Sequence, residues 1–191
     1  LGHVGIALTF GFVVVALIYS FAHLSGAHFN PAVTIAFWSI GEFDSKKVIP
    51  YIGAQILGAI AASASLYFLL NENFVTMSEV SYLGATLPNG SVTQAFGFEL
   101  ILTFILMIVI CSSAVHGKAT KDFAGLAIGL TVGLEAMFAG PITGGSMNPA
   151  RSIGPAVMSG NYDHLWIYIV ATIIGAVIAA QVFLKLFHSD Y

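Results

Sequence analysis

The sequence predicts an all-α membrane protein organised as an inverted repeat, and three observations lead to this prediction. Hydrophobic residues make up 58% of the 191-residue chain and charged residues only 8%, whereas a soluble domain is about 25% charged. The mean hydropathy is +0.91, and the apolar residues form runs long enough to cross a bilayer. Finally, the polar phrase SGAHFNPAV at 25–33 returns in similar form as TGGSMNPAR at 143–151.

Five apolar segments each have about the 20 residues that a membrane-spanning helix requires. They are 4–24, 49–70, 95–115, 123–140 and 165–187. Two shorter apolar stretches, 31–40 and 149–158, directly follow the two polar phrases. At about 1.5 Å per residue, each reaches only about half of a ~30 Å hydrocarbon core. We therefore expect these two stretches to be half-helices that enter the membrane and return on the same side.

The positive charges predict the orientation of the spans. The loop 71–92 and the segment MSGNYDH contain no Lys or Arg. Five of the six positively charged residues fit one topology, in which the ends of the spans that carry them lie in the cytoplasm. These residues are Lys46, Lys47, Lys118, Lys121 and Lys185. In this topology the two half-helices enter from opposite faces of the membrane, which is typical of an inverted repeat.

We interpret residues 1–191 as a single transmembrane domain, with 1–70 as an incomplete first repeat and 95–187 as the second. Within the second repeat, two predicted spans, 95–115 and 123–140, precede the polar phrase, whereas in the first repeat only 4–24 precedes it. We therefore expect six spanning helices in the natural protein, the first of them upstream of Leu1 and absent from this sequence.

Each polar phrase contains Asn-Pro-Ala, a combination that favours a helix start. Proline is favoured at the first helical position, and asparagine is a preferred N-cap whose side-chain oxygen accepts a backbone hydrogen bond. The two triplets comprise Asn30, Pro31, Ala32, Asn148, Pro149 and Ala150. Opposed half-helices bring two N-termini together near the midplane, each with about +0.5 of a charge. We expect both Asn NH₂ groups to remain free to donate to a passing molecule, and expect Gly26, Gly144 and Gly145 to line the same pathway.

The two phrases resemble the two signatures of the aquaporin, or major intrinsic protein, family. YIGAQILGA and GFELILTFILM resemble its third and fourth helices, so the resemblance covers essentially the whole chain. It implies an aquaporin-like right-handed bundle of six spanning helices with two re-entrant half-helices. It also implies a homotetramer in the lipid bilayer of a plasma or cell membrane, with one pore per subunit, passive transport and no cofactor.

In this family a four-residue constriction sets the selectivity. Alignment outward from the Asn-Pro-Ala boxes places it at Phe10, Ala136, Gly145 and Arg151. Strict water channels have His where this chain has the smaller, less polar Ala136, while Ser152 and Ala156 resemble the water-channel pattern. The resemblance therefore implies a water channel with a widened mouth that also passes small neutral solutes such as glycerol or ammonia. A glycerol-type facilitator is the alternative.

Several further residues have expected roles beside the pore. Glu99 resembles the family's buried glutamate that braces the re-entrant backbone, and His28 is expected on the cytoplasmic side of the pore. His23 is expected to pack between helices. Glu135 lies near the outer end of its span, where it lines a vestibule or is a solvated helix-end carboxylate. Asn89 begins the sequence NGS, which matches a glycosylation pattern.

Other classes of protein fit the sequence less well. A secondary transporter usually adds acidic coupling-ion sites within its spans, and here only Glu99 and Glu135 are candidates. A structural membrane protein with a closed pore stays open as an alternative. No set of nucleophile, base and oxyanion donors indicates an enzyme. The single Cys111, the unclustered histidines and the net charge of −3 give no indication of a metal site or of a nucleic-acid partner.

Overall fold

The computed structural model describes residues 2–70 and 83–187, and its regular structure there is helical. A π-helical turn, Cys111–Val115, continues α5, and a 3-10 turn, Lys121–Phe123, precedes α6. The α-helices are α1 (Gly2–Ser25), α2 (Pro31–Ser39), α3 (Ser45–Leu70), α5 (Val92–Ile110), α6 (Ala124–Thr143), α7 (Pro149–Ser159) and α8 (Leu165–Phe187).

Five of these helical segments are long and apolar enough to cross a membrane, which confirms the five predicted spans. They are Gly2–Ser25, Ser45–Leu70, Val92–Val115, Lys121–Thr143 and Leu165–Phe187. The expected further helix upstream of Leu1 stays a prediction. Residues 71–82, which the sequence assigns to an outer loop, lie outside the described residues.

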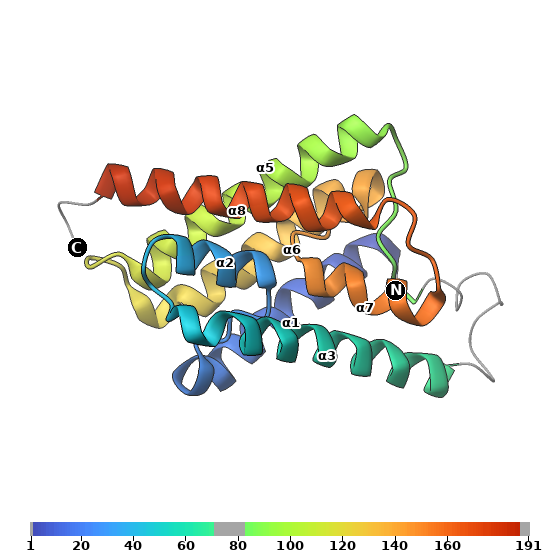
Figure 1. Ribbon diagram of the computed structural model, residues 1–191, viewed down its shortest axis with the longest axis horizontal. Coiled ribbons are helices and arrows are strands. Elements are labelled where there is room, and N and C mark those ends of the chain that lie inside the picture. The colour runs from blue at the N-terminus through green and yellow to red at the C-terminus, as the bar shows by residue number, and fades with distance from the viewer. Residues whose placement is uncertain (1, 71–82, 188–191) are drawn as a thin grey trace.

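The two short helices lie between the long ones, as Figure 1 shows, with α8 along one side of the molecule and α3 along the other. Helix α2 packs against α8, and α7 packs against α3. Each half-helix therefore contacts the last span of the other half of the chain. The half-helices also contact each other, so the two Asn-Pro-Ala boxes meet inside the bundle.

Helix α6 continues beyond its predicted end at 140 and stops at Thr143, although it contains Pro141. Proline lacks an N–H and leaves the carbonyl four residues earlier without its helical partner. That carbonyl belongs to Met137, and His3 of α1 donates a hydrogen bond to it from Nε2 at 2.7 Å. The helix then ends at Gly144 with a φ of 87°, a left-handed conformation that suits glycine.

Glycines bring α1 and α6 into close contact near the centre of the bundle. A Cβ atom on Gly11 would lie 2.8 Å from the Gly129 carbonyl oxygen, and a Cβ on Gly129 would lie 2.7 Å from the Gly11 oxygen and 2.8 Å from the Val15 nitrogen. Small residues permit such backbone approach between membrane helices. This contact holds the backbones of α1 and α6 together.

We predict that Gly129→Ala destabilises the fold, because the added methyl group meets rigid backbone atoms of α1. Overpacking of this kind costs about 1–3 kcal/mol. Gly58→Ala on α3 is the matched control, since a Cβ there would come within 4 Å of no heavy atom from the other described parts of the structure. Thermal unfolding in detergent should show a lower midpoint for Gly129→Ala only; equal midpoints for the two variants contradict the prediction.

Candidate pore

The residues predicted to form the pathway converge on one cavity with a volume of about 640 Å³. Eight of the fourteen predicted site residues line it: Phe10, Gly26, His28, Asn30, Ala136, Gly145, Asn148 and Arg151. The Pro and Ala members of both triplets are buried in the first turns of α2 and α7 instead. Gly144 and Glu99 are not among the residues that line the cavity, and Gly144 instead provides the left-handed cap that ends α6.

Both asparagines cap a half-helix in the same way. Asn30 has extended backbone, and its Oδ1 accepts a hydrogen bond from the Ala32 N–H at 2.9 Å. Asn148 is also extended, and its Oδ1 accepts from Ala150 at 3.0 Å and from Arg151 at 3.3 Å. Each cap satisfies first-turn N–H groups that have no partner within the helix.

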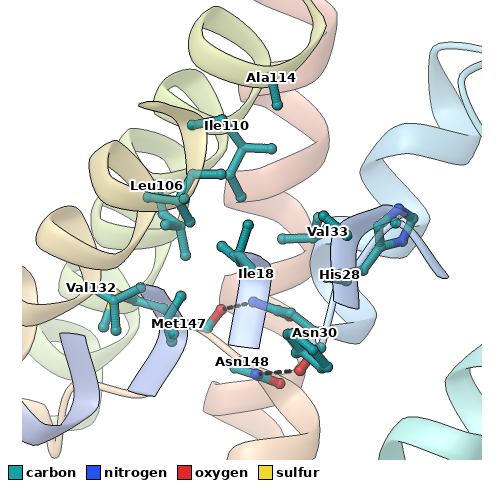
Figure 2. Close-up of a pocket in the computed structure, with 18 of the residues that line it drawn as sticks. Ile18, His28, Asn30, Val33, Leu106, Ile110, Ala114, Val132, Met147 and Asn148 are labelled. Atoms are coloured by element: carbon teal, nitrogen blue, oxygen red, sulfur yellow. Dashed lines mark hydrogen bonds between the residues drawn. The ribbon is translucent and has the colours of Figure 1, made fainter. Parts of the chain in front are cut away.

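The two asparagines also tie the re-entrant loops to each other (Figure 2). Asn30 donates from Nδ2 to the carbonyl of Met147 at 2.7 Å, and Asn148 donates from Nδ2 to the carbonyl of Phe29 at 2.9 Å. The expectation that both NH₂ groups are free is therefore wrong, because each uses one hydrogen in this reciprocal pair. Each amide still has a second hydrogen for a molecule in the cavity.

The residues that supply these carbonyls have unusual backbone conformations. Phe29 has a φ of 50° and Met147 a φ of 55°, a left-handed region in which a non-glycine residue costs on the order of 1–3 kcal/mol. The reciprocal hydrogen bonds and the caps hold both residues in place. The strained conformation directs each carbonyl at the opposite asparagine, so the strain is tied to the meeting of the two half-helices.

The four residues predicted to form the constriction line the cavity together. The Arg151 guanidinium carbon lies 5.0 Å from the centroid of the Phe10 ring, within the range of a cation–π contact. A Cβ on Gly145 would lie 3.4 Å from the Cα of Ala136, so these two small residues are neighbours. One part of the constriction is thus cationic and donor-rich, and the rest is apolar and lacks bulky polar groups.

A backbone carbonyl outside the predicted set holds the arginine. Arg151 donates from Nη1 to the carbonyl of Gly84 at 2.6 Å. Sequence reasoning missed Gly84, because a backbone acceptor 67 residues away carries no side-chain signal. Nearby, Asn89 donates from Nδ2 to the Pro141 carbonyl at 2.8 Å, so the amide of the NGS sequence is engaged in a hydrogen bond within the protein.

Glu99 on α5 is fully buried and braces the second re-entrant loop. Its Oε1 accepts hydrogen bonds from the Thr143 hydroxyl at 2.7 Å and from the Ser146 N–H at 2.9 Å. Its Oε2 accepts from the Met147 N–H at 2.8 Å. Both carboxylate oxygens therefore satisfy buried donors immediately before Asn148.

Glu135 on α6 fits neither of the two roles expected for it, a vestibule residue or a solvated carboxylate at a helix end. Glu135 is 7% exposed and does not line the cavity, so it is neither a vestibule residue nor a solvated helix end. Neither of its carboxyl oxygens has a hydrogen-bond partner among the described residues.

His28 lines the cavity from the loop that precedes α2, outside the five candidate spans. Its ring is 4.9–5.0 Å from those of Phe37, Phe43 and Tyr51, and its Nδ1 is 3.1 Å from Thr34 Oγ1. Burial lowers the pKa of the His28 imidazole from 6.5 to about 4. The side chain is therefore neutral at physiological pH and adds no charge to the cavity.

Apolar side chains form most of the remaining wall, and sequence reasoning assigned none of them to the site. Figure 2 shows several of them around the two asparagines. They include Val14, Ile18, Val33, Leu106, Ile110, Ala114, Ile128 and Val132. A pore-lining valine has no sequence feature that separates it from a core valine. His23 also lines the cavity, which contradicts the expectation that it packs between helices.

Around the asparagines and the constriction, this arrangement offers a few hydrogen-bond donors in a mostly apolar wall. The donors there are the two Asn amides and the Arg151 guanidinium, supported by the positive ends of two half-helices. Polar residues elsewhere in the lining include Tyr19, His23, Lys121 and Asp122. In the described part of the chain, no group of three or more His, Cys, Asp or Glu side chains could hold a metal ion. The site therefore suits small neutral molecules with oxygen or nitrogen acceptors.

Comparisons with known proteins agree with this geometry. Residues 1–183 match the family described as Major intrinsic protein. The chain is 48% identical to Nodulin-26 of Glycine max over 94% of its length, and 47% identical to Aquaporin NIP1-2 of Arabidopsis thaliana over 97%. It spans 64% of the length of each of these two relatives.

A solved structure with a similar fold is the aquaglyceroporin from Plasmodium falciparum, with a TM-score of 0.82 and 32% sequence identity. The alignment covers 97% of this chain and 83% of that one.

Proposed function

The chain belongs to the major intrinsic protein family, and from that premise we propose that it forms a passive transmembrane channel for water and small neutral solutes. Since its described residues include five helices long and apolar enough to cross a bilayer, it is an integral, multi-pass membrane protein. The observation that carries the proposal is the convergence of both capped asparagines and the four constriction residues on one cavity. The named relatives, an aquaporin and an aquaglyceroporin, support the same activity.

Water passes the midplane by accepting hydrogen bonds from the remaining amide hydrogens of Asn30 and Asn148. The apolar wall around them offers few competing partners, so a molecule is held weakly enough to leave again. The carbonyls of Phe29 and Met147 already accept from the asparagines.

The same features oppose the passage of cations. Two half-helix N-termini, each with about half a positive charge, meet near the asparagines. Arg151 adds a full positive charge at the constriction. Water molecules that accept from both asparagines are oriented so that a continuous proton-conducting chain is interrupted.

The constriction supports passage of solutes larger than water. Ala136 and Gly145 leave space where a bulky polar side chain would narrow the path, and the Phe10 ring gives an apolar surface for carbon–hydrogen groups. Arg151 donates to hydroxyl oxygens on the other side. Glycerol therefore fits the constriction chemically, and a glycerol-type facilitator is the second candidate function, favoured by the likeness to an aquaglyceroporin.

We also propose a homotetramer in a cell membrane, with one pore in each subunit. Many large apolar side chains of α1 and α3 are exposed, among them Val4, Phe12, Leu57 and Phe68. Such surfaces require contact with lipid or with another apolar protein surface.

Stopped-flow light scattering on proteoliposomes of the full-length protein tests the choice of solute. We expect rapid shrinkage in an impermeant osmolyte, and in a glycerol gradient we expect reswelling faster than in empty liposomes. Arg151→Val should raise glycerol permeability about tenfold, because it removes the side chain that narrows the constriction, and each tenfold corresponds to about 1.4 kcal/mol. If both the wild type and Arg151→Val shrink fast but show no glycerol influx, the proposal that the constriction is wide enough for glycerol is contradicted.

A further inference from the structure

Residues 83–90, which we call the strap, lie against the site and contribute no side chain to the cavity lining. The strap is anchored at its far end, where Asn89 donates from its backbone N–H to the Ile142 carbonyl at 3.0 Å. Nearer the constriction, a Cβ on Gly144 would lie 3.0 Å from the Cα of Thr86. The strap therefore packs directly on the end of α6.

Thr86 begins a chain of buried hydroxyl groups. It is 5% exposed, and it donates from Oγ1 to Ser152 Oγ at 2.8 Å. Ser152 Oγ and Ser146 Oγ are 2.6 Å apart, and Ser146 donates to the Asn148 carbonyl at 3.0 Å. Donation in one direction, from Thr86 through Ser152 and Ser146 to Asn148, satisfies all three hydroxyl hydrogens.

The strap makes two hydrogen bonds to consecutive residues of α7. The Gly84 carbonyl accepts from the Arg151 guanidinium, and Thr86 donates to Ser152. Gly84 is the only hydrogen-bond acceptor of the Arg151 side chain among the described residues, and Arg151 Nε is buried there without a partner. The position of the guanidinium thus depends on where the strap holds the Gly84 carbonyl.

We propose that Thr86 is a positioning residue that sets the selectivity of the constriction through Arg151. Its hydroxyl fixes the strap to α7, and the fixed strap holds the Gly84 carbonyl at the distance that keeps the guanidinium facing Phe10 and the cavity. Loss of the hydroxyl lets Gly84 and the guanidinium move together, which widens the constriction. This inference rests on the proposed channel function, because selectivity has meaning only if the cavity conducts.

Thr86→Val tests the proposal, since valine keeps the side-chain volume and removes the hydroxyl. The readout is the ratio of glycerol to water permeability in proteoliposomes of the full-length protein, with each variant incorporated to the same density. We expect Thr86→Val to raise this ratio about fivefold, the factor that one buried hydrogen bond of typical strength is worth. Thr86→Ser, which restores the donor, should return the ratio to near the wild-type value.

Two further variants separate positioning from a general loss of packing. Ser152→Ala removes the acceptor from the opposite side and should shift the ratio in the same direction. Thr131→Val is the matched control, because the one hydrogen bond of the Thr131 hydroxyl among the described residues goes to the Ala127 carbonyl of its own helix. Its ratio should stay at the wild-type value. In an Arg151→Val background, Thr86→Val should cause no further change, since the group that it positions is absent.

The outcomes distinguish this inference from the proposed function. If the wild-type protein conducts no water, the channel function itself is overturned. If it conducts water and neither Thr86→Val nor Ser152→Ala changes the ratio, the positioning role is overturned and the channel stands. An equal shift from Thr86→Val with and without Arg151 also overturns the role, because the effect then does not pass through the guanidinium.

Discussion

Glu99→Gln is expected to abolish water conduction and to prevent stable folding of the second re-entrant loop. Both carboxylate oxygens accept hydrogen bonds, Oε1 from Thr143 and Ser146, and Oε2 from Met147. Glutamine has only one oxygen, so in either orientation its NH₂ group faces a buried donor. Each buried donor left without an acceptor costs about 1–3 kcal/mol, and that cost falls on the residues that position Asn148.

The structure provides a matched control on the neighbouring helix. Glu135 is also a buried acidic residue of a span, but neither of its oxygens has a partner among the described residues. Glu135→Gln should therefore leave the thermal midpoint and the water permeability close to those of the wild type. Thermal unfolding in detergent and stopped-flow shrinkage measure both variants. Similar behaviour of the two variants contradicts the assignment of Glu99 as the brace.

Asn148→Asp is expected to open the channel to cations while leaving the half-helix in place. Aspartate is as good an N-cap as asparagine, so Ala150 and Arg151 keep their acceptor. The carboxylate cannot donate to the Phe29 carbonyl, and its negative charge offsets the positive ends of both half-helices. We expect proton leak across proteoliposomes to rise about tenfold or more, equivalent to at least about 1.4 kcal/mol in the barrier.

A pH-sensitive dye trapped in the liposomes measures this leak under an imposed potential. Asn161→Asp is the control, because Asn161 lies in the loop between α7 and α8, and its Oδ1 accepts from the Asp163 N–H, a bond that aspartate also forms. Its leak should equal that of the wild type. An unchanged leak in Asn148→Asp would show that the barrier to cations does not depend on the midplane charge.

Much of the fold could be predicted because it depends on local chemistry. Apolar length defined the five spans, and Asn followed by Pro defined the starts of α2 and α7. The extension of α6 past Pro141 could not be predicted locally. It depends on a histidine at the other end of the chain, His3, which satisfies the carbonyl that the proline leaves free.

The site was predictable where a residue type is unusual for its surroundings. Polar residues in an apolar chain pointed to both asparagines and to Arg151, which all line the cavity. The reciprocal bonds between the loops were not predictable, because they join an asparagine to a backbone carbonyl more than a hundred residues away. For the same reason, no feature of the sequence pointed to Gly84 as the acceptor of Arg151.

The sequence also could not separate Glu99 from Glu135 on physical grounds. Both are acidic residues in apolar spans, and only the resemblance to a family singled out the first. What distinguishes them is the set of donors that the second re-entrant loop presents to Glu99, and that set exists only once the chain has folded.

The central claim is that the cavity conducts water, and the osmotic water permeability of proteoliposomes containing the full-length protein tests it most directly. The measurement compares shrinkage rates in an impermeant osmolyte with those of empty liposomes over a range of temperatures. We predict faster shrinkage with a weak temperature dependence, because water moves along preformed donors and crosses no lipid. Shrinkage at the rate and with the temperature dependence of empty liposomes would contradict the account and favour a closed, structural role.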